Sequence, residues 1–481
     1  MKIIKIALGL TLTVAMVASL SSCVGAKAER PRIADLKFKE MITHIPKTKR
    51  VTLGNGIVVH LLPDHELPLI HMSAMIKVGS IWEPADKTGL AALTGQVIRA
   101  GGTKTRTPDD LDETLETIAA SVETGIGGES GSASLSALSK DFKLGLEIFA
   151  DVLRNPAFNE ERFELAKARM LDSIRRENDS PTSVALRELG ELLYAGSSYG
   201  RKATLESVGS ITRDDVIAFH KKYFVPSNVM LGITGDYNEE TIIAELEKVF
   251  ATWSGGATAY PPVRHVKESY DGGVYIASKK LRQSVIRAGH LAVRRTDPDY
   301  FKLRVMDEIL GGGGFSSRIV KKVRTDRGLA YSVWSYYIGG RWEMGRFLLG
   351  AETKTSSTAE VIEIFIDEVK RIQSEDVTKA ELNLAKNSIV NSFVFIFDRS
   401  TRILGEWMKM DYYDYPENYL ETYRDKVMET TIEDVRRVAN EYLHPDGLKI
   451  VVVGDPDGFE RSLSEFGKVS AIELRDYSEE N

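Results

Sequence analysis

Alternating apolar and polar positions near the start of the chain predict β-strands. The stretch "VTLGNGIVVHLLPD" (51–64) predicts a hairpin, because Asn55-Gly56 favours the tight turn that joins two antiparallel strands. The stretch "LIHMSAMIKVGS" (69–80) predicts another strand. Apolar residues then recur mostly at helical spacing, with one further strand at "NVMLGITGD" (228–236). The helices predicted for this half cover residues 88–99, 108–120, 139–153, 159–177, 186–195, 212–223 and 238–251.

The stretch "SGGATAYPPVRHVKES" (254–269) has no periodicity and is rich in Gly and Pro, which predicts a linker. A similar order of elements follows it. The tyrosine-rich run "MDYYDYPENY" (410–419) is expected on the surface of a helix end. The elements predicted after the linker are strands at 273–279, 284–292 and 448–455 and helices at 298–311, 378–396 and 431–442.

The two halves are also similar residue by residue. Residues 212–236 align without a gap on residues 431–455, so that Asp215 falls on Asp434, 219 positions later. The same offset places "LAKARMLDSI" (165–174) on "LAKNSIVNSF" (384–393). Two regions that share one offset predict duplicated domains rather than chance similarity. Mixed helices and antiparallel strands make the predicted fold class α+β, in which each domain is a mainly antiparallel sheet covered by helices.

The bulk composition excludes several classes of protein. The chain has 481 residues, of which 43% are hydrophobic, and a net charge of −6 from well-mixed basic and acidic residues. This composition is ordinary for globular proteins, and no basic patch argues for binding to nucleic acid. After residue 20 no stretch is apolar enough to predict a membrane span.

The N-terminus has the pattern of an exported bacterial lipoprotein. Lys2 and Lys5 precede an apolar run of 15 residues that ends at Leu20, which suits a signal peptide better than a membrane span. The next residues, Ser21-Ser22-Cys23, complete a stretch that resembles the box in which the cysteine is lipidated. The alternative is an ordinary signal peptide in which the cysteine is incidental.

We therefore expect residues 1–22 to be a lipoprotein signal peptide and residues 23–45 to be a linker anchored by lipid at Cys23. The expected location is the bacterial cell envelope, on the periplasmic side and anchored to the outer membrane. The lipid would be the only contact with a membrane.

The common nucleotide-binding and metallopeptidase motifs are absent from the sequence. There is no P-loop, and neither H-E-x-x-H nor H-x-x-E-H occurs. His60, His65 and His71 crowd one predicted strand pair, but prolines interrupt regular ligand spacing, so we expect structural or exposed roles. His220 is expected on the surface or edge of a helix. The chain is therefore expected to bind no metal or cofactor of its own.

The stretch "GLAALTGQVIRAGGTKTRT" (89–107) predicts a helix that ends at Gly101-Gly102. From Gly89 to Ile98 it contains no charged residue, no histidine and no cysteine. A second glycine-rich stretch, "LGGGGFSSRIVKKVRTDRGLAYSV" (310–333), lies in the other half. Together with the duplicated halves, these stretches resemble the insulinase/pitrilysin family of zinc peptidases over residues 46–470. The similarity is to its shorter bacterial and mitochondrial-processing-type members.

The resemblance implies a degenerate zinc site. In catalytic members the first of these helices reads G-L-A-H-x-x-E-H, in which two histidines bind zinc and the glutamate is the general base. The histidine positions fall here on Ala92 and Gln96, and the glutamate position falls on Gly95. The third ligand of the family would fall near Ser173, and Glu177 is the one nearby glutamate.

The second glycine-rich stretch keeps another motif of the family, R-x-x-x-G-L-x-Y, as Arg324 and Tyr331. In catalytic assemblies such a pair reaches the zinc site from another part of the assembly and holds the substrate backbone and the developing oxyanion. The resemblance therefore implies that Arg324 and Tyr331 bind substrate in trans. The alternative is that they are fold residues, with Arg324 paired to Asp326 or Glu343.

The expected organisation places an insulinase-like N-terminal domain with the degenerate zinc site at 46–253 and a C-terminal domain with the Arg/Tyr motif at 271–470. The linker covers 254–270, and a tail covers 471–481. By resemblance, the chain would form one bowl-shaped half of a chamber.

Three functions remain open from the sequence. The first is a non-catalytic, substrate-binding subunit that forms a heterodimer with a zinc-bearing family member and acts on peptides. The second is a structural or binding scaffold of the same fold without a role in proteolysis. The third is an enzyme with an unrecognised site, for which no pattern of His, Cys or carboxylates provides support.

Overall fold

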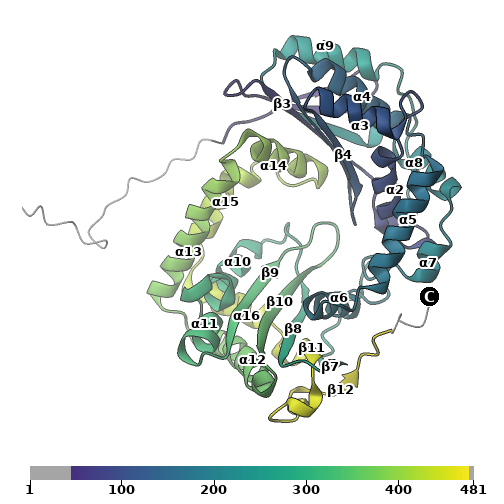
Figure 1. Ribbon diagram of the computed structural model, residues 1–481. Helices are drawn as coiled ribbons and strands as arrows, with labels where there is room; N and C mark the ends of the chain where they lie inside the picture. Colours follow the sequence, from purple (N-terminus) through teal and green to yellow (C-terminus); the bar gives the residue numbers. More distant parts are fainter. Residues whose placement is uncertain (1–44, 476–481) are drawn as a thin grey trace, which may run out of the picture. The chain divides into compact units, whose positions relative to one another are not determined.

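The computed structural model describes residues 45–475, which contain two six-stranded sheets with helices around them (Figure 1). The strands of the first sheet lie in the order β1-β2-β6-β3-β5-β4. All neighbours are antiparallel except β2 and β6. Their bounds are β1 Lys49–Thr52, β2 Val58–Pro63, β3 Leu69–Ile76, β4 Ser121–Ile126, β5 Gly131–Leu138 and β6 Val229–Gly235.

The second sheet repeats this order with strands from the other half of the chain. Its order is β12-β7-β11-β8-β10-β9, so that β11 lies parallel to β7 just as β6 lies parallel to β2. The edge strands β4 and β9 correspond as well. The bounds are β7 Gly273–Ser278, β8 Gln283–Ala292, β9 Ala330–Ile338, β10 Gly345–Lys354, β11 Lys449–Gly454 and β12 Val469–Ala471.

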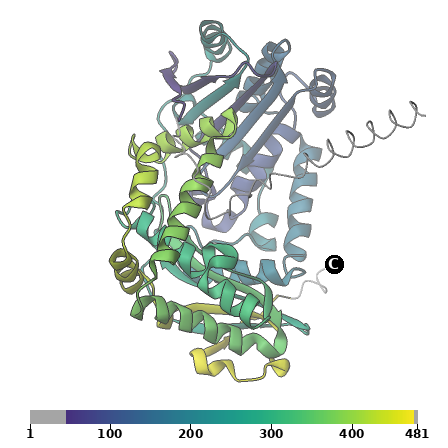
Figure 2. The ribbon, with the colours of Figure 1, turned by 90° about the vertical axis from the view of Figure 1, so that its left-hand side faces the viewer.

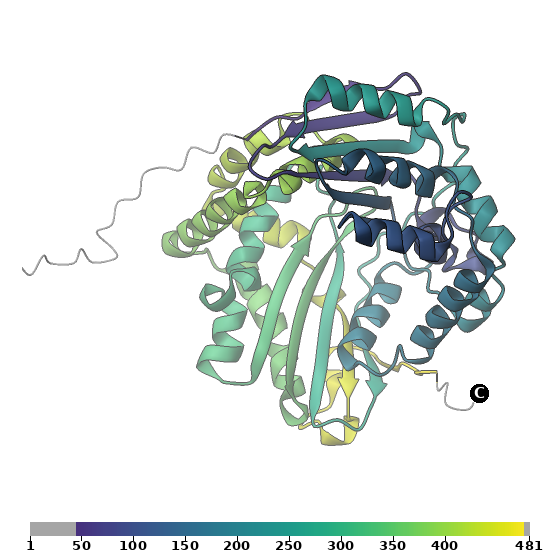
Figure 3. The same cartoon turned by 45° about the horizontal axis from the view of Figure 1, so that its top comes forward.

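Helices pack around both sheets, and α4, for example, packs on β5 and against α9 (Figure 3). The helices of the first half are α2 Leu90–Ala100, α3 Pro108–Thr117, α4 Phe142–Arg154, α5 Glu160–Arg175, α6 Pro181–Leu193, α7 Leu205–Gly209, α8 Arg213–Tyr223 and α9 Glu239–Phe250. Those of the second half are α10 Tyr300–Asp307, α11 Arg318–Val320, α12 Thr358–Ser374, α13 Lys379–Phe393, α14 Ser400–Tyr412, α15 Tyr419–Met428 and α16 Ile432–Tyr442.

The sequence repeat corresponds to a repeated structural unit, and its helices begin at the same capping box. The Thr212 hydroxyl accepts from the Asp215 N–H at 3.2 Å, and the Thr431 hydroxyl accepts from the Asp434 N–H at 3.1 Å. In both boxes the aspartate side chain accepts in return from the threonine N–H. This reciprocal pair satisfies donors that a helix start leaves unpaired, which explains why α8 and α16 begin at equivalent positions.

The two halves exchange a helix. Helix α6 begins at Pro181 and α14 begins at Ser400, 219 positions later, and each packs on the sheet of the opposite half. The α6 side chains that meet β8 and β11 are apolar, while Leu404 and Met408 of α14 pack on β2 and β6. Gly232 allows this approach, because a Cβ there would come within 3.0 Å of Leu404. Figure 2 shows α14, in yellow-green, beside the purple and blue strands of the first sheet.

A second contact between the halves involves the hairpin between β9 and β10. Trp342 in its turn stacks on Tyr412 with ring centres 5.4 Å apart and lies 5.7 Å from the ring of Trp82. The Tyr412 hydroxyl donates to the backbone carbonyl of Glu129, in the turn between β4 and β5, at 2.9 Å. The turns of two corresponding hairpins therefore meet through aromatic rings.

The α+β class and the duplicated architecture are confirmed, and the hairpin at Asn55-Gly56 forms between β1 and β2. The expectation for residues 410–419 is wrong, because Tyr413, Tyr415 and Tyr419 are buried where the second core meets the exchanged helix. The predicted helix at 186–195 begins earlier, at Pro181.

The predicted signal peptide (1–22) and Cys23 lie outside the described residues, as does most of the 23–45 linker. The predicted domain boundaries stay predictions. Between residues 45 and 475, no helix has the length and apolar character needed to cross a membrane.

Candidate functional site

Helix α2 is the first element of the candidate site, and a buried carboxylate holds its N-terminal end. The two carboxylate oxygens of Glu83 accept hydrogen bonds from the backbone N–H groups of Gly89 and Ala91, at 3.0 and 2.8 Å. Burial raises the pKa of Glu83 above its ordinary value. Gly89 has a φ of +107°, a backbone conformation that favours glycine. The helix therefore begins at Leu90, close to the start that the sequence predicts.

The predicted zinc positions carry no zinc-ligating side chain. Ala92 is half-buried, Gln96 is exposed on the helix surface, and Ser173 is exposed on α5. A methyl group, an amide and a hydroxyl do not fit a zinc ion, which takes imidazole, thiolate or carboxylate ligands. Within residues 45–475, no three His, Cys, Asp or Glu side chains form a group that could hold a metal ion.

Gly95, at the position of the family's general base, is buried against the edge strand β4. A Cβ built on Gly95 would overlap the backbone nitrogen of Ile126 and come within 2.8 Å of the carbonyl carbon of Gly125. The Thr124 hydroxyl also donates to the Gly95 carbonyl at 2.7 Å. Helix and strand therefore approach so closely that this backbone arrangement has no space for a glutamate side chain.

The second element is the glycine-rich stretch of the other half, which begins in one π-helical segment, Glu308–Gly312, and contains a second, Lys321–Asp326. Such segments are rare and occur frequently at functional sites. Gly311 packs against β9, because a Cβ there would lie 2.8 Å from the backbone nitrogen of Ser335. Gly328, with a φ of +62°, makes the turn into β9.

Arg324 and Tyr331 are brought together by this arrangement. Arg324 lies in the second π-helical segment and Tyr331 near the start of the edge strand β9, where the pairing with β10 is irregular. The guanidinium carbon of Arg324 lies 4.1 Å from the centre of the Tyr331 ring, in cation–π contact. The Tyr331 side chain is 82% exposed, so its hydroxyl is open to a ligand.

The neighbouring charges are paired elsewhere. Arg318 forms a bidentate ion pair with Glu381 at 2.7 and 3.2 Å, and Arg327 pairs with Glu360. The two carboxylates that could have bound Arg324 have other partners, since Asp326 pairs with Lys321 and Glu343 with His265. In the part of the chain that the structure describes, no carboxylate lies within 4.0 Å of the Arg324 guanidinium.

Two residues that sequence reasoning missed support this unit. Asp307 is buried and accepts from the Ser335 hydroxyl at 2.5 Å and the Tyr337 N–H at 3.0 Å, which ties the first π-helical segment to β9. Burial raises the pKa of Asp307. Phe315, at the end of the glycine run, is 66% exposed and lies 4.4 Å from the Arg324 guanidinium carbon. The glycine-rich stretch could have pointed to Phe315, whereas Asp307 lies before that stretch and has no local signal.

The histidines take the structural roles expected of them, with one correction. His60 is buried and bonded to Asp411 at 3.0 Å, while His65 is exposed and bonded to Asp236 at 2.7 Å. His220 is buried rather than on the helix surface, because it lies against Phe158 and Phe224 and its Nε2 meets the Leu153 carbonyl at 2.9 Å. Burial lowers the pKa of His220 to about 4.

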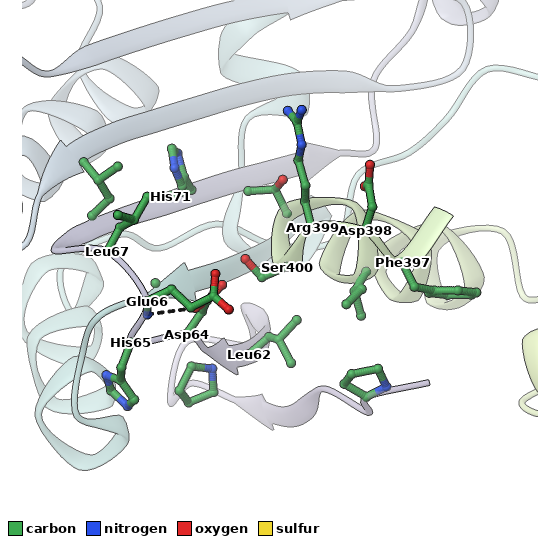
Figure 4. A pocket seen from close by; sticks show the side chains of 16 residues that line it. Leu62, Asp64, His65, Glu66, Leu67, His71, Phe397, Asp398, Arg399 and Ser400 are labelled. Carbon is green, nitrogen blue, oxygen red and sulfur yellow. Dashed lines mark hydrogen bonds between the residues drawn. The ribbon is translucent and has the colours of Figure 1, made fainter. Parts of the chain in front are cut away.

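A cavity of about 600 Å³ lies away from Arg324 and Tyr331, between the β2–β3 connection and the start of α14 (Figure 4). Two of its acidic groups, Asp64 and Asp398, have partners, and the Asp398 carboxylate accepts from Arg402 at 3.0 Å. The Asp64 carboxylate accepts from the Glu66 N–H at 3.1 Å, and the Ser400 hydroxyl lowers the pKa of Asp64. We find no arrangement of catalytic side chains in this cavity.

Comparison with known proteins gives matches over most of the described residues. The family model described as "Insulinase (Peptidase family M16)" matches residues 65–204, and the model described as "Peptidase M16 inactive domain" matches residues 210–389. The chain is 25% identical over 340 residues to an uncharacterized zinc protease of Rickettsia bellii, covering 70% of this chain and 81% of that protein.

Two solved structures share the fold. A peptidase M16 inactive domain from Pseudomonas fluorescens superposes with a TM-score of 0.78 and 25% identity, over 85% of this chain and 98% of that one. The periplasmic protease PqqL of Escherichia coli superposes with a TM-score of 0.72 and 15% identity. In that case 92% of this chain corresponds to 50% of the longer chain.

Proposed function

Because the chain belongs to the insulinase family, peptidase family M16, we propose that it is a non-catalytic, substrate-binding subunit of a zinc peptidase. The zinc would be held by a second family member in a heterodimer, and the substrate would be a peptide. This chain would supply Arg324 and Tyr331 to the shared site and cleave nothing alone.

The observation that carries the proposal is the contrast between the two halves. Helix α2 has Ala92, Gly95 and Gln96 where the family's catalytic members have ligands and a base. The other half keeps Arg324 and Tyr331 in contact, and Tyr331 is exposed. A fold residue as large as Tyr331 would bury its ring, whereas here the ring contacts a cation and solvent. This pair is useful in catalysis only where another chain supplies the metal.

The chemistry of the pair suits the binding of a peptide group. A guanidinium offers N–H donors in a fixed plane, and a phenol hydroxyl donates one further hydrogen bond. Donors of this kind can hold a backbone carbonyl of the substrate and the oxyanion that forms during peptide hydrolysis. The proposal assigns only these donor roles to the chain, since its own residues do not fit a zinc ion.

A longer protein that contains this fold supports assembly with a second subunit. This fold accounts for half of the longer periplasmic protease chain with which it superposes. Two units of this fold would therefore reproduce the size of that single chain. The "inactive domain" description of the model that matches residues 210–389 agrees with a second half that has no zinc site of its own.

We also propose that the protein is a lipoprotein of the bacterial envelope that faces the periplasm. The proposal rests on the sequence of residues 1–23, with Lys2, Lys5 and the Leu20-Ser21-Ser22-Cys23 box. Radiolabelled palmitate in the purified protein, and its loss in Cys23→Ala, would test the lipid anchor.

The function is tested by gentle isolation of the native chain from its own envelope. We expect an H-x-x-E-H family member to copurify at equal stoichiometry, and the pair to cleave unstructured peptides that neither chain cleaves alone. Isolation of the chain alone, or with envelope proteins that are not peptidases, would contradict the proposal and favour a scaffold function.

A further inference from the structure

Phe315 is the residue of the glycine-rich stretch whose position is hardest to explain by folding. Its side chain is 66% exposed, and it contacts the cation of Arg324 rather than the hydrophobic core. It follows Gly314, whose φ of +60° lets the loop turn outward. An exposed aromatic side chain on a glycine loop needs another reason to be there.

That reason lies in the guanidinium of Arg324. Its central carbon is 4.4 Å from the centre of the Phe315 ring and 4.1 Å from the centre of the Tyr331 ring. Two aromatic rings therefore contact one guanidinium. Aromatic faces attract a cation and match the weakly hydrated faces of a guanidinium, while the N–H donors lie in its plane.

We propose that Phe315 is a positioning residue that holds Arg324 with its N–H donors free for an oxygen of the bound peptide. This inference rests on the proposed function and adds a residue to it. Phe315 acts through Arg324 rather than on the substrate. Without Phe315 the side chain of Arg324 keeps one aromatic contact and samples more rotamers, so each hydrogen bond to the substrate costs more entropy.

The charges nearby agree with this role. In residues 45–475 no carboxylate orients Arg324, because Asp326 pairs with Lys321. An acidic partner would hold the guanidinium as well, but it would also occupy the donors that the substrate needs. Aromatic contacts hold the guanidinium of Arg324 in place and leave its N–H donors free to bind the substrate.

The direct test is the Nε–Hε signal of Arg324 in NMR spectra of the ¹⁵N-arginine-labelled mature chain, assigned by its loss in Arg324→Lys. Aromatic ring currents should shift the signal, and Phe315→Ala should move it toward the random-coil position. Phe315→Tyr should restore it. Phe395→Ala is the matched control, because Phe395 is 65% exposed in another part of the second half. An unchanged Arg324 signal in Phe315→Ala would overturn the inference.

The functional test is a double-mutant cycle in the copurified pair, with an internally quenched unstructured peptide of about 15 residues as the probe. Loss of one exposed cation–π contact should lower kcat/KM about two- to fivefold in Phe315→Ala. The same substitution in an Arg324→Ala background should have no further effect, because Phe315 would have nothing left to position. Equal effects of Phe315→Ala in both backgrounds would overturn the inference. Wild-type activity of Arg324→Ala would instead contradict the proposed function, whichever way the NMR signal behaves.

Discussion

The backbone of Ile126 occupies the space that a side chain on Gly95 would need. A Cβ on Gly95 would overlap the Ile126 nitrogen, and the carbonyl carbon of Gly125 would lie 2.8 Å from it. Helix α2 thus lacks space for a side chain at position 95, in addition to lacking zinc-ligating side chains at Ala92 and Gln96. Restoring the missing side chains alone would therefore not be expected to restore a zinc site.

The close contact between Gly95 and β4 predicts that a substitution at position 95 of α2 has a different outcome from substitutions at positions 92 and 96. Ala92→His with Gln96→His should leave the melting temperature nearly unchanged, because these positions are half-buried and exposed. Adding Gly95→Glu should destabilise the protein by about 1–3 kcal/mol or more, since overpacking forces the backbone to shift. Thermal unfolding and zinc calorimetry would measure both effects. A stable triple variant that binds zinc tightly would show that the contact between α2 and β4 is not a barrier.

A second prediction concerns the hydroxyl of Tyr331. In the copurified pair, Tyr331→Phe should lower kcat about 10²-fold, the loss typical of one oxyanion donor, with KM changed much less. Tyr336→Phe is the matched control, because Tyr336 lies on the same strand and is 46% exposed. Steady-state kinetics with one peptide substrate would compare the two. Equal activity of both variants would make Tyr331 a fold residue.

A third prediction concerns the aromatic contact of the β9–β10 turn with the end of α14 and with Trp82 of the first half. Trp342 lies 5.4 Å from Tyr412, 5.3 Å from Tyr413 and 5.7 Å from Trp82, measured between ring centres. Trp342→Ala should lower the free energy of unfolding by about 3 kcal/mol, near the lower limit for a large aromatic residue because the side chain is half-buried. Trp342→Phe should keep most of the free energy of unfolding that Trp342→Ala loses. Urea unfolding would measure the change, and a loss below about 0.5 kcal/mol would mean that this contact does not join the halves.

The sequence predicted the elements that a short local signal determines, but it did not predict the hairpin of β4 with β5 or that of β9 with β10. The hairpin at Asn55-Gly56, the capping boxes at Thr212 and Thr431, and the glycine stop after α2 are each contained in a few residues. The repeat offset of 219 also survives in the structure, where it relates α6 to α14. Local patterns and duplication were therefore enough to predict the fold class.

The features of the fold and of the site that the sequence did not predict depend on long-range packing, which no local pattern indicates. The exchange of α6 and α14 between sheets buries Tyr413 and Tyr415, which the sequence placed at an exposed helix end. Leu153 and Phe158, distant in sequence, likewise bury His220. The roles of Phe315 and Gly95 need coordinates, since they depend on a stacking distance and on the approach of a strand.

The buried histidines predict how stability changes with pH. Burial lowers the pKa of His220 and of His290 to about 4, from 6.5 for an exposed histidine. Between these values the unfolded chain binds protons that the folded chain does not, so stability falls as pH decreases from about 6.5 to about 4. Each histidine can account for at most about 3 kcal/mol of this loss.

Substitution of one buried histidine should remove its share of the pH dependence. His220→Gln keeps a donor for the Leu153 carbonyl but does not titrate, so the free energy of unfolding should vary less with pH than in the wild type. His65→Gln is the control, because the side chain of His65 is 65% exposed. Urea unfolding between about pH 7 and about pH 4 would compare the three proteins. A slope in His220→Gln equal to that of the wild type would mean that His220 binds protons equally in the folded and unfolded states.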